Sequence, residues 1–151
     1  MLNKVTQHVN IKAAGSEFNP LLEFENLPAF DRIESVHARP ALERFYRRAA
    51  RDEIAPRLDR ATELAGTSYS ALDIRAQRTR WASCSAGGRM SFNWRLLLAP
   101  ERVLEYVVWH EVCHLQILDH SPRFWALVER RWPSYREDRQ WLSRHGATLV
   151  L

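Results

Sequence analysis

The sequence is poor in the features that mark several classes of protein. It contains only two cysteines, Cys84 and Cys113, among 151 residues, which is too few for a disulfide framework and favours a reducing compartment. No run of about 18 uncharged apolar residues occurs, so a transmembrane helix is not expected. Residues 1–15 lack the apolar core of a secretory signal. We therefore expect a cytoplasmic protein that does not associate with a membrane.

Charge of either sign does not dominate, but it is unevenly distributed. The formal net charge is +4, of which residues 1–38 contribute −2 and the remainder +6, almost all of it as arginine. A basic domain attracts phosphates or acidic partners. Many of the arginines alternate with acidic residues, however, as on a solvated surface with salt bridges. The charge is thus compatible with nucleic-acid binding without requiring it, and it does not indicate an oligomeric state.

The pattern of apolar residues predicts one domain preceded by an N-terminal segment. All six tryptophans lie in the second half of the chain, so we expect the core there. Up to about residue 32 there is no sustained periodicity, which suits either a flexible tail or a strap over the basic domain. We divide the chain into residues 1–38, extended or partly disordered, and a domain of residues 39–151.

Helix and turn signals predict an α+β fold. Pro40 and Gly66 suit the start and end of a helical region, which Pro56 would break or bend. Two segments of alternating polarity flank Gly87-Gly88 and predict an antiparallel hairpin at about residues 72–98. Proline-started helices should follow at about residues 100–117, 121–131 and 133–146. The expected fold is therefore a small antiparallel sheet packed beside several helices.

A histidine-rich stretch, VVWHEVCHLQILDHSPRFW, suggests a metal site. His110 and His114 are four residues apart, so on a helix they project from one face, one turn apart. Two imidazole nitrogens at this spacing can reach one ion. Glu111 is rotated by about 100°, where its carboxylate can take a proton from water without binding the ion. This is the H-E-x-x-H arrangement of zinc hydrolases, and we expect Zn²⁺ as the cofactor.

His120 is the leading candidate for a third ligand, with Glu129 and His145 as alternatives. On an unbroken helix His120 would point about 120° away from His114. The helix must therefore end between residues 115 and 119 and restart at Ser121-Pro122. The two cysteines are expected to be structural thiols, because Cys113 points away from His114 on the same helix.

The second half of the chain resembles a known family, the YgjP-like metallopeptidase domain, which is a relative of SprT-like and gluzincin-type zinc peptidases. The resemblance is carried by the stretch RTRWASCSAGGRMSFNWRLLLAPERVLEYVVWHEVCHLQILDHSPRFW and its continuation to about residue 145. The resemblance implies zinc held by His110, His114 and His120, Glu111 as catalytic base, and a zincin-like fold with the sheet beside the metal helix. Ala82 stands where the family usually has glycine. Residues 1–38 show no counterpart of the β-rich N-terminal half of fuller family members.

We accordingly expect a zinc metallopeptidase that hydrolyses peptide bonds. The strand at residues 89–95 is a candidate for pairing with an extended peptide or protein substrate, with Asn93 and Arg95 near the cleft, although plain solvent-facing positions explain them equally well. Arg123 is a candidate for contacting an oxyanion or a carboxylate. Two other functions remain open: a metal-dependent hydrolase of nucleotide phosphates, and a zinc-containing module that binds DNA or protein without catalysis. A peptidase recruited to DNA, as some SprT-like relatives are, would combine these classes.

Overall fold

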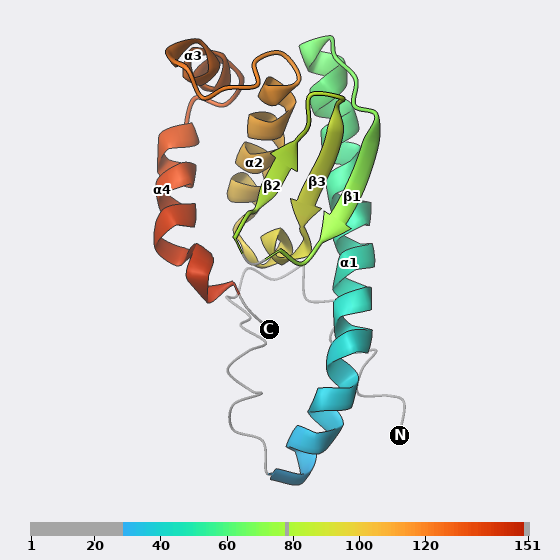
Figure 1. The fold of residues 1–151 in the computed structure, drawn as a ribbon. Helices are drawn as coiled ribbons and strands as arrows, with labels where there is room; N and C mark the ends of the chain where they lie inside the picture. Colours follow the sequence, from blue (N-terminus) through green and yellow to red (C-terminus); the bar gives the residue numbers. More distant parts are fainter. Residues whose placement is uncertain (1–28, 78, 150–151) are drawn as a thin grey trace.

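The computed structural model describes residues 29–77 and 79–149, with side chains from residue 40 onward, so the predictions for residues 1–28 lie outside the described residues. The element order is α1 (Ala29–Ala65), β1 (Ala71–Arg75), β2 (Ala82–Cys84), β3 (Arg89–Asn93), η2 (Trp94–Leu98), α2 (Glu101–His114), α3 (Pro122–Arg131), α4 (Tyr135–His145) and η3 (Gly146–Thr148). Four helices and one small sheet confirm the predicted α+β fold (Figure 1).

Helix α1 is one continuous element that supports the sheet. Ala50, Ile54 and Leu58 recur at helical spacing and are fully buried, which is why this face packs against the rest of the domain. The helix ends as predicted, with Gly66 at φ +66° and the Thr67 amide donating to the Thr62 carbonyl. Its predicted start was wrong: the helix begins at Ala29, so Pro40 lies inside it and not in its first turn.

The sheet is mixed, with the strand order β1-β3-β2. The predicted reversal at Gly87-Gly88 is present, with Gly88 at φ +74°, but it joins β3 to β2. The first predicted strand, β1, pairs with β3 in parallel, Leu72 opposite Met90 and Ile74 opposite Phe92. The sheet as a whole is therefore not the antiparallel hairpin that the alternation predicted, because the short strand β2 occupies the antiparallel position beside β3.

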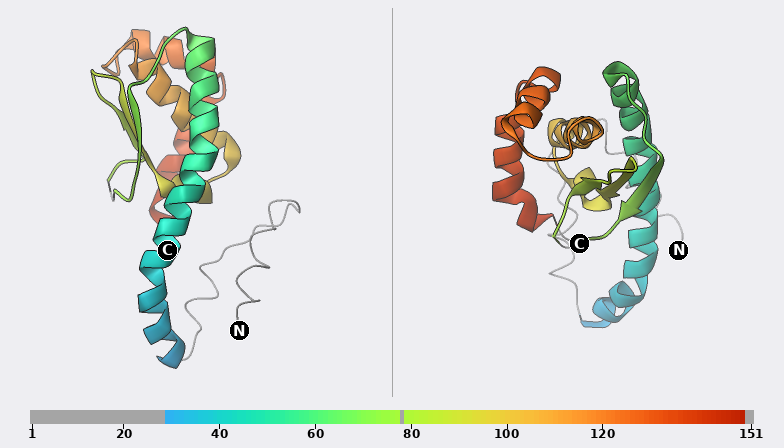
Figure 2. Two further views of the ribbon diagram at one scale, coloured as in Figure 1. Left: turned by 90° about the vertical axis from the view of Figure 1, so that its right-hand side faces the viewer. Right: turned by 45° about the horizontal axis from the view of Figure 1, so that its top comes forward.

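Helices cover one face of the sheet and continue beyond it. In the views of Figures 1 and 2, α1 and α2 run behind the strands, α4 lies beside α2, and α3 crosses one end. Contacts of α2 with α1, β2, α3 and α4 make it the central helix of the domain. Met90, Phe92, Trp94, Val103 and Val108 are fully buried and form the middle of the core. In the described part of the chain, no helix is long and apolar enough to span a membrane.

Candidate metal centre

The last turn of α2 carries His110, Glu111 and His114, and the chain then turns back. The helix ends at His114, one residue before the interval of 115–119 that we predicted, and its C-cap residue Leu115 is the first residue of that interval. In the connection between α2 and α3, the Asp119 carboxylate accepts a hydrogen bond of 3.0 Å from the backbone amide of Ser121. Helix α3 then starts with Pro122 in its first turn. This short return brings His120 beside the two histidines of α2.

The three histidines point their Nε2 atoms at one another. The Nε2 separations are 3.1 Å for His110 and His120, 3.2 Å for His114 and His110, and 3.2 Å for His114 and His120. Imidazole nitrogens at about 2.0–2.1 Å from a tetrahedral ion would be about 3.3 Å apart. The observed triangle is therefore close to the one that such an ion requires. Among the described residues, these three form the group of side chains able to hold a metal ion.

A backbone carbonyl fixes the orientation of the central imidazole. Nδ1 of His114 lies 3.0 Å from the carbonyl oxygen of Ile117. Because a carbonyl can only accept, Nδ1 must carry the proton, and neutral His114 then turns an Nε2 lone pair toward the other two rings. Metal-binding histidines usually donate their second ring nitrogen in this way, which fixes both tautomer and direction.

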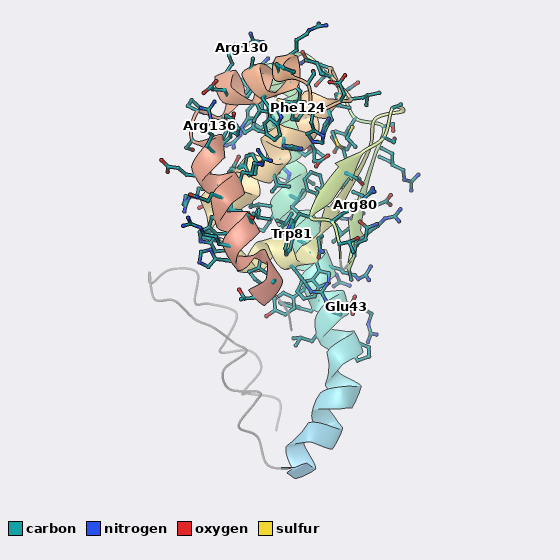
Figure 3. The ribbon with its side chains drawn as sticks, turned by 60° about the vertical axis from the view of Figure 1, so that its left-hand side comes forward. Glu43, Arg80, Trp81, Phe124, Arg130 and Arg136 are labelled. Carbon is teal, nitrogen blue, oxygen red and sulfur yellow. The ribbon has the colours of Figure 1, made fainter. Side chains whose placement is uncertain are left out.

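Two aromatic side chains of α3 surround the histidines. The ring of Phe124 stacks on His114 at 4.3 Å with an interplanar angle of 19°, and Trp125 stacks on His120 at 5.6 Å. Phe124 is fully buried, and Figure 3 shows it on the inner side of α3, with Arg130 on the outer side. The stacked rings limit rotation of the imidazoles and exclude water from one side of the centre.

The surroundings keep the imidazoles neutral, which is the form that binds a metal. Burial, reinforced by the neighbouring histidines, lowers the pKa of His110 to about 3. Burial also lowers the pKa of His114. Both rings are therefore unprotonated at neutral pH, and their lone pairs do not have to lose a proton before binding a cation.

Glu111 is a buried carboxylate without an ion-pair partner among the described residues. The residue is 5% exposed, and its Oε2 has no hydrogen-bond partner in the part of the chain that the structure describes. Burial raises its pKa to about 8. Burial, and then the charge of Glu111, raises the pKa of Cys84 in β2 to about 11. Such a carboxylate beside three convergent imidazoles is suited to accepting and returning protons.

The alternative ligands from the sequence are engaged elsewhere. Glu129 forms an ion pair of 2.5 Å with Arg136. His145 stacks on Trp141 and its Nδ1 lies 3.1 Å from the carbonyl oxygen of that residue. Cys113 is a buried thiol whose pKa is raised to about 11 by burial, which agrees with a structural role.

The polar residues of β3 do not form a substrate-binding edge. Strand β3 has a partner on each side, so an extended peptide cannot pair with it, contrary to our prediction. Asn93 is 4% exposed, and its amide accepts from the backbone of Arg95 and donates to the carbonyl oxygens of Gln77 and Arg80. The guanidinium of Arg95 stacks on the adjacent ring of Trp94 at 4.6 Å. The side chain of Asn93 thus holds the preceding loop in place.

Arg123 lies on a different side of α3 from Trp125. It lines a depression of about 370 Å³ together with Ile117 and Arg130. Trp125 follows two residues later, which on a helix is a rotation of about 200°. The depression therefore borders the turn between the histidines, on the side that Trp125 does not occupy.

Several contributors to the site were missed in the sequence. The carbonyl of Ile117 carries no side-chain signal at all. Phe124 and Trp125 were visible as an aromatic pair four and five residues after the third histidine, in a helix otherwise rich in arginine. Arg139, on α4, places its guanidinium over the ring of Trp125 at 4.6 Å, which no local pattern indicates.

Comparisons with known proteins agree with this arrangement. The YgjP-like metallopeptidase domain matches residues 6–145. The crystal structure of the metallopeptidase zymogen of Pyrococcus abyssi abylysin is similar in fold, with a TM-score of 0.53 and 23% sequence identity over 60% of this chain and 93% of that chain. No curated protein matches. Because the family match covers almost the whole sequence, the chain belongs to the YgjP-like metallopeptidase family, and it is a metal-dependent peptidase.

Proposed function

We propose that the protein is a zinc-dependent peptidase in which His110, His114 and His120 hold the ion and Glu111 is the general base. The observation that carries this proposal is the convergence of three Nε2 atoms within 3.2 Å beside a buried, unpartnered carboxylate. Three nitrogen ligands suit zinc, and a set of three leaves a position open, as catalytic sites do. When bound, the ion would supply Lewis acidity that polarises a carbonyl and makes water more acidic.

Glu111 has the surroundings that proton transfer requires. Its Oε2 would take a proton from the attacking water and deliver it to the departing amine. Burial raises the pKa of this carboxyl to about 8, so it both accepts and releases a proton near neutral pH. Because Glu111 directly follows His110 and precedes His114 by three residues, its position is fixed by the same turn of α2.

The outer edge of β2 is the strand edge that we propose for an extended substrate. The Asn93 amide donates to the Trp81 carbonyl, and the Ser85 amide donates to the Arg89 carbonyl. In an antiparallel pair these bonds alternate, so the backbone groups of Ala82 and Cys84 face away from β3. Strand β2 packs against α2, which brings this edge close to the histidines. A peptide added here would pass the metal centre in an extended conformation.

At the other edge of the sheet, arginine side chains of α1 donate hydrogen bonds to backbone carbonyl oxygens of β1. Arg47 donates to the carbonyl oxygen of Ile74 at 3.3 Å, and Arg51 donates to that of Leu72 at 2.8 Å. These contacts oppose pairing of another strand with β1. The two free thiols favour a reducing compartment, and we propose the cytoplasm.

Two substitutions separate the roles of ligand and base. His114→Ala is expected to lose bound zinc, measured by atomic emission, and with it all hydrolysis. Glu111→Gln should keep zinc and lose hydrolysis of a mixed peptide library. His145→Ala is the matched control, because His145 lies outside the cluster, and it should keep both properties. Cleavage by Glu111→Gln at the wild-type rate, or hydrolysis of nucleoside triphosphates in place of peptides, would contradict the proposal.

A further inference from the structure

Arg139 is placed at the metal centre by a chain of stacked side chains. Its guanidinium lies 4.6 Å from the ring centroid of Trp125. The ring of Trp125 is in turn 5.6 Å from those of both His120 and His110. Because Trp125 contacts both histidine rings and holds the guanidinium over its own ring, Arg139 borders the histidine cluster.

This guanidinium has no carboxylate partner in the part of the chain that the structure describes. Neighbouring arginines are paired: Arg136 of the same helix binds Glu129, and Arg102 of α2 binds Asp138. Asp138, next to Arg139 in the sequence, is fully buried and also accepts hydrogen bonds from Trp132 and Ser134. Arg139 is an exposed residue. A planar fork of donors held on an aromatic ring and left unpaired is well suited to a carboxylate.

We propose that Arg139 is a specificity residue that binds a carboxylate of the peptide substrate beside the metal centre. The inference rests on the proposed peptidase function and adds the chemistry of the preferred substrate. The carboxylate belongs either to an acidic side chain near the cleaved bond or to the free C-terminus of the peptide. In both cases the guanidinium of Arg139 forms two parallel hydrogen bonds with it.

The position of α4 agrees with this role. Helix α2 packs against β2 on one flank and against α4 on the other (Figure 1). A peptide on the outer edge of β2 would therefore have the histidines beneath it and Arg139 on the far side. The ring of Trp125 keeps the guanidinium of Arg139 from rotating freely, so the guanidinium would be held in place for a bound carboxylate.

The test compares Arg139→Gln with Arg136→Gln in the zinc-loaded, full-length protein. Both substitutions remove one exposed guanidinium from α4 that lies over an aromatic ring. Cleavage of a peptide library is followed by individual peptides in pairs, with Glu against Gln at each position and a free against an amidated C-terminus. Wild type and Arg136→Gln should prefer the acidic member about 10- to 100-fold in kcat/KM, chiefly through KM. Arg139→Gln should lose the preference, and Arg139→Lys should keep only part of it.

A binding measurement keeps this inference separate from the peptidase proposal. The affinity of the same peptides is measured in the Glu111→Gln background, where no cleavage is expected, with and without Arg139→Gln. An acid preference that survives in Arg139→Gln, or its absence in the wild type, overturns the inference while cleavage upholds the peptidase. If no peptide is cleaved, the peptidase proposal fails, and the affinities alone decide about Arg139. A loss of affinity confined to a DNA oligonucleotide would assign the guanidinium to phosphate and overturn the inference as well.

Discussion

Replacement of Glu111 by glutamine should make the metal-free protein more stable, although it removes the proposed catalytic base. The carboxylate is 5% exposed, and one of its oxygens has no partner. In the unfolded chain the same group is solvated and has a pKa near 4.5, whereas burial raises the value to about 8 in the folded protein. The folded state therefore binds a proton more tightly, and folding stability falls as the pH rises from about 4.5 to about 8.

The size of the effect follows from these two values. Each unit of pKa difference corresponds to about 1.4 kcal/mol, so at pH 7 the carboxylate destabilises the metal-free fold by about 3 kcal/mol relative to its neutral form. Glutamine has nearly the same shape and no charge. Glu111→Gln should accordingly be more stable by about 3 kcal/mol at pH 7 and by less than about 1 kcal/mol at pH 5. For a domain of this size, the difference at pH 7 corresponds to about 6–12 °C in Tm.

Urea unfolding of both proteins in the presence of a chelator measures this difference directly. Comparing the variant with the wild type at each pH cancels the titration of the histidines, which both proteins share. Adding zinc back should reduce the gain, because a nearby cation favours the ionised carboxylate. Equal stability of the two proteins at pH 7 without metal would show that Glu111 is well solvated, and the argument for a desolvated base would be refuted.

Two further substitutions test how the site is supported. A Cβ at Gly146 would lie 2.8 Å from the ring of Trp81, so Gly146→Ala should lower the free energy of unfolding, measured by urea titration, by about 1–3 kcal/mol. Gly87→Ala is the control, because a Cβ there would have no atom closer than 3.9 Å, and it should change the free energy of unfolding by less than about 1 kcal/mol. Asp138→Asn should lower the free energy of unfolding by about 2 kcal/mol, because an amide has a single acceptor oxygen and cannot serve both the indole of Trp132 and the guanidinium of Arg102. A thermal shift of under 1 °C would contradict this.

The metal helix and its turn were predictable from the sequence because their signals are local. Spacing along a helix determines which side chains share a face, so His110 and His114 had to project together. The requirement that His120 join them predicted an end of α2 at residues 115–119, and the helix ends one residue earlier, at His114. Proline and glycine also gave most of the other boundaries, with the exception of the start of α1 at Ala29.

The pairing of the strands was not predictable, because it depends on contacts between distant segments. Alternating polarity marks β1 and β3 equally well, whether they pair in parallel or antiparallel. The strand that decides the outcome is β2, only three residues long, whose residues Ala82–Cys84 show no alternation of burial. Because β2 pairs with β3, the strand edge open to a substrate is not at residues 89–95, as predicted, but at Ala82 and Cys84 of β2. For the same reason, the role of Arg139 was not predictable from the sequence: eighteen residues lie between it and His120, and only the packing of α4 against α2 brings them together.

The end of α2 at His114 determines the position of His120, the role of the Ile117 carbonyl and the start of α3. If the helix continued past His114, His120 would be carried to another side, and the carbonyl of Ile117 would be used within the helix and not by His114. Ending the helix there leaves the negative end of its dipole at the histidines, which favours a cation. It also allows α3 to start with its aromatic residues against the imidazoles. A variant that extends α2 by one turn should therefore lose metal binding even with all three histidines retained, and zinc content together with helical circular dichroism would measure it.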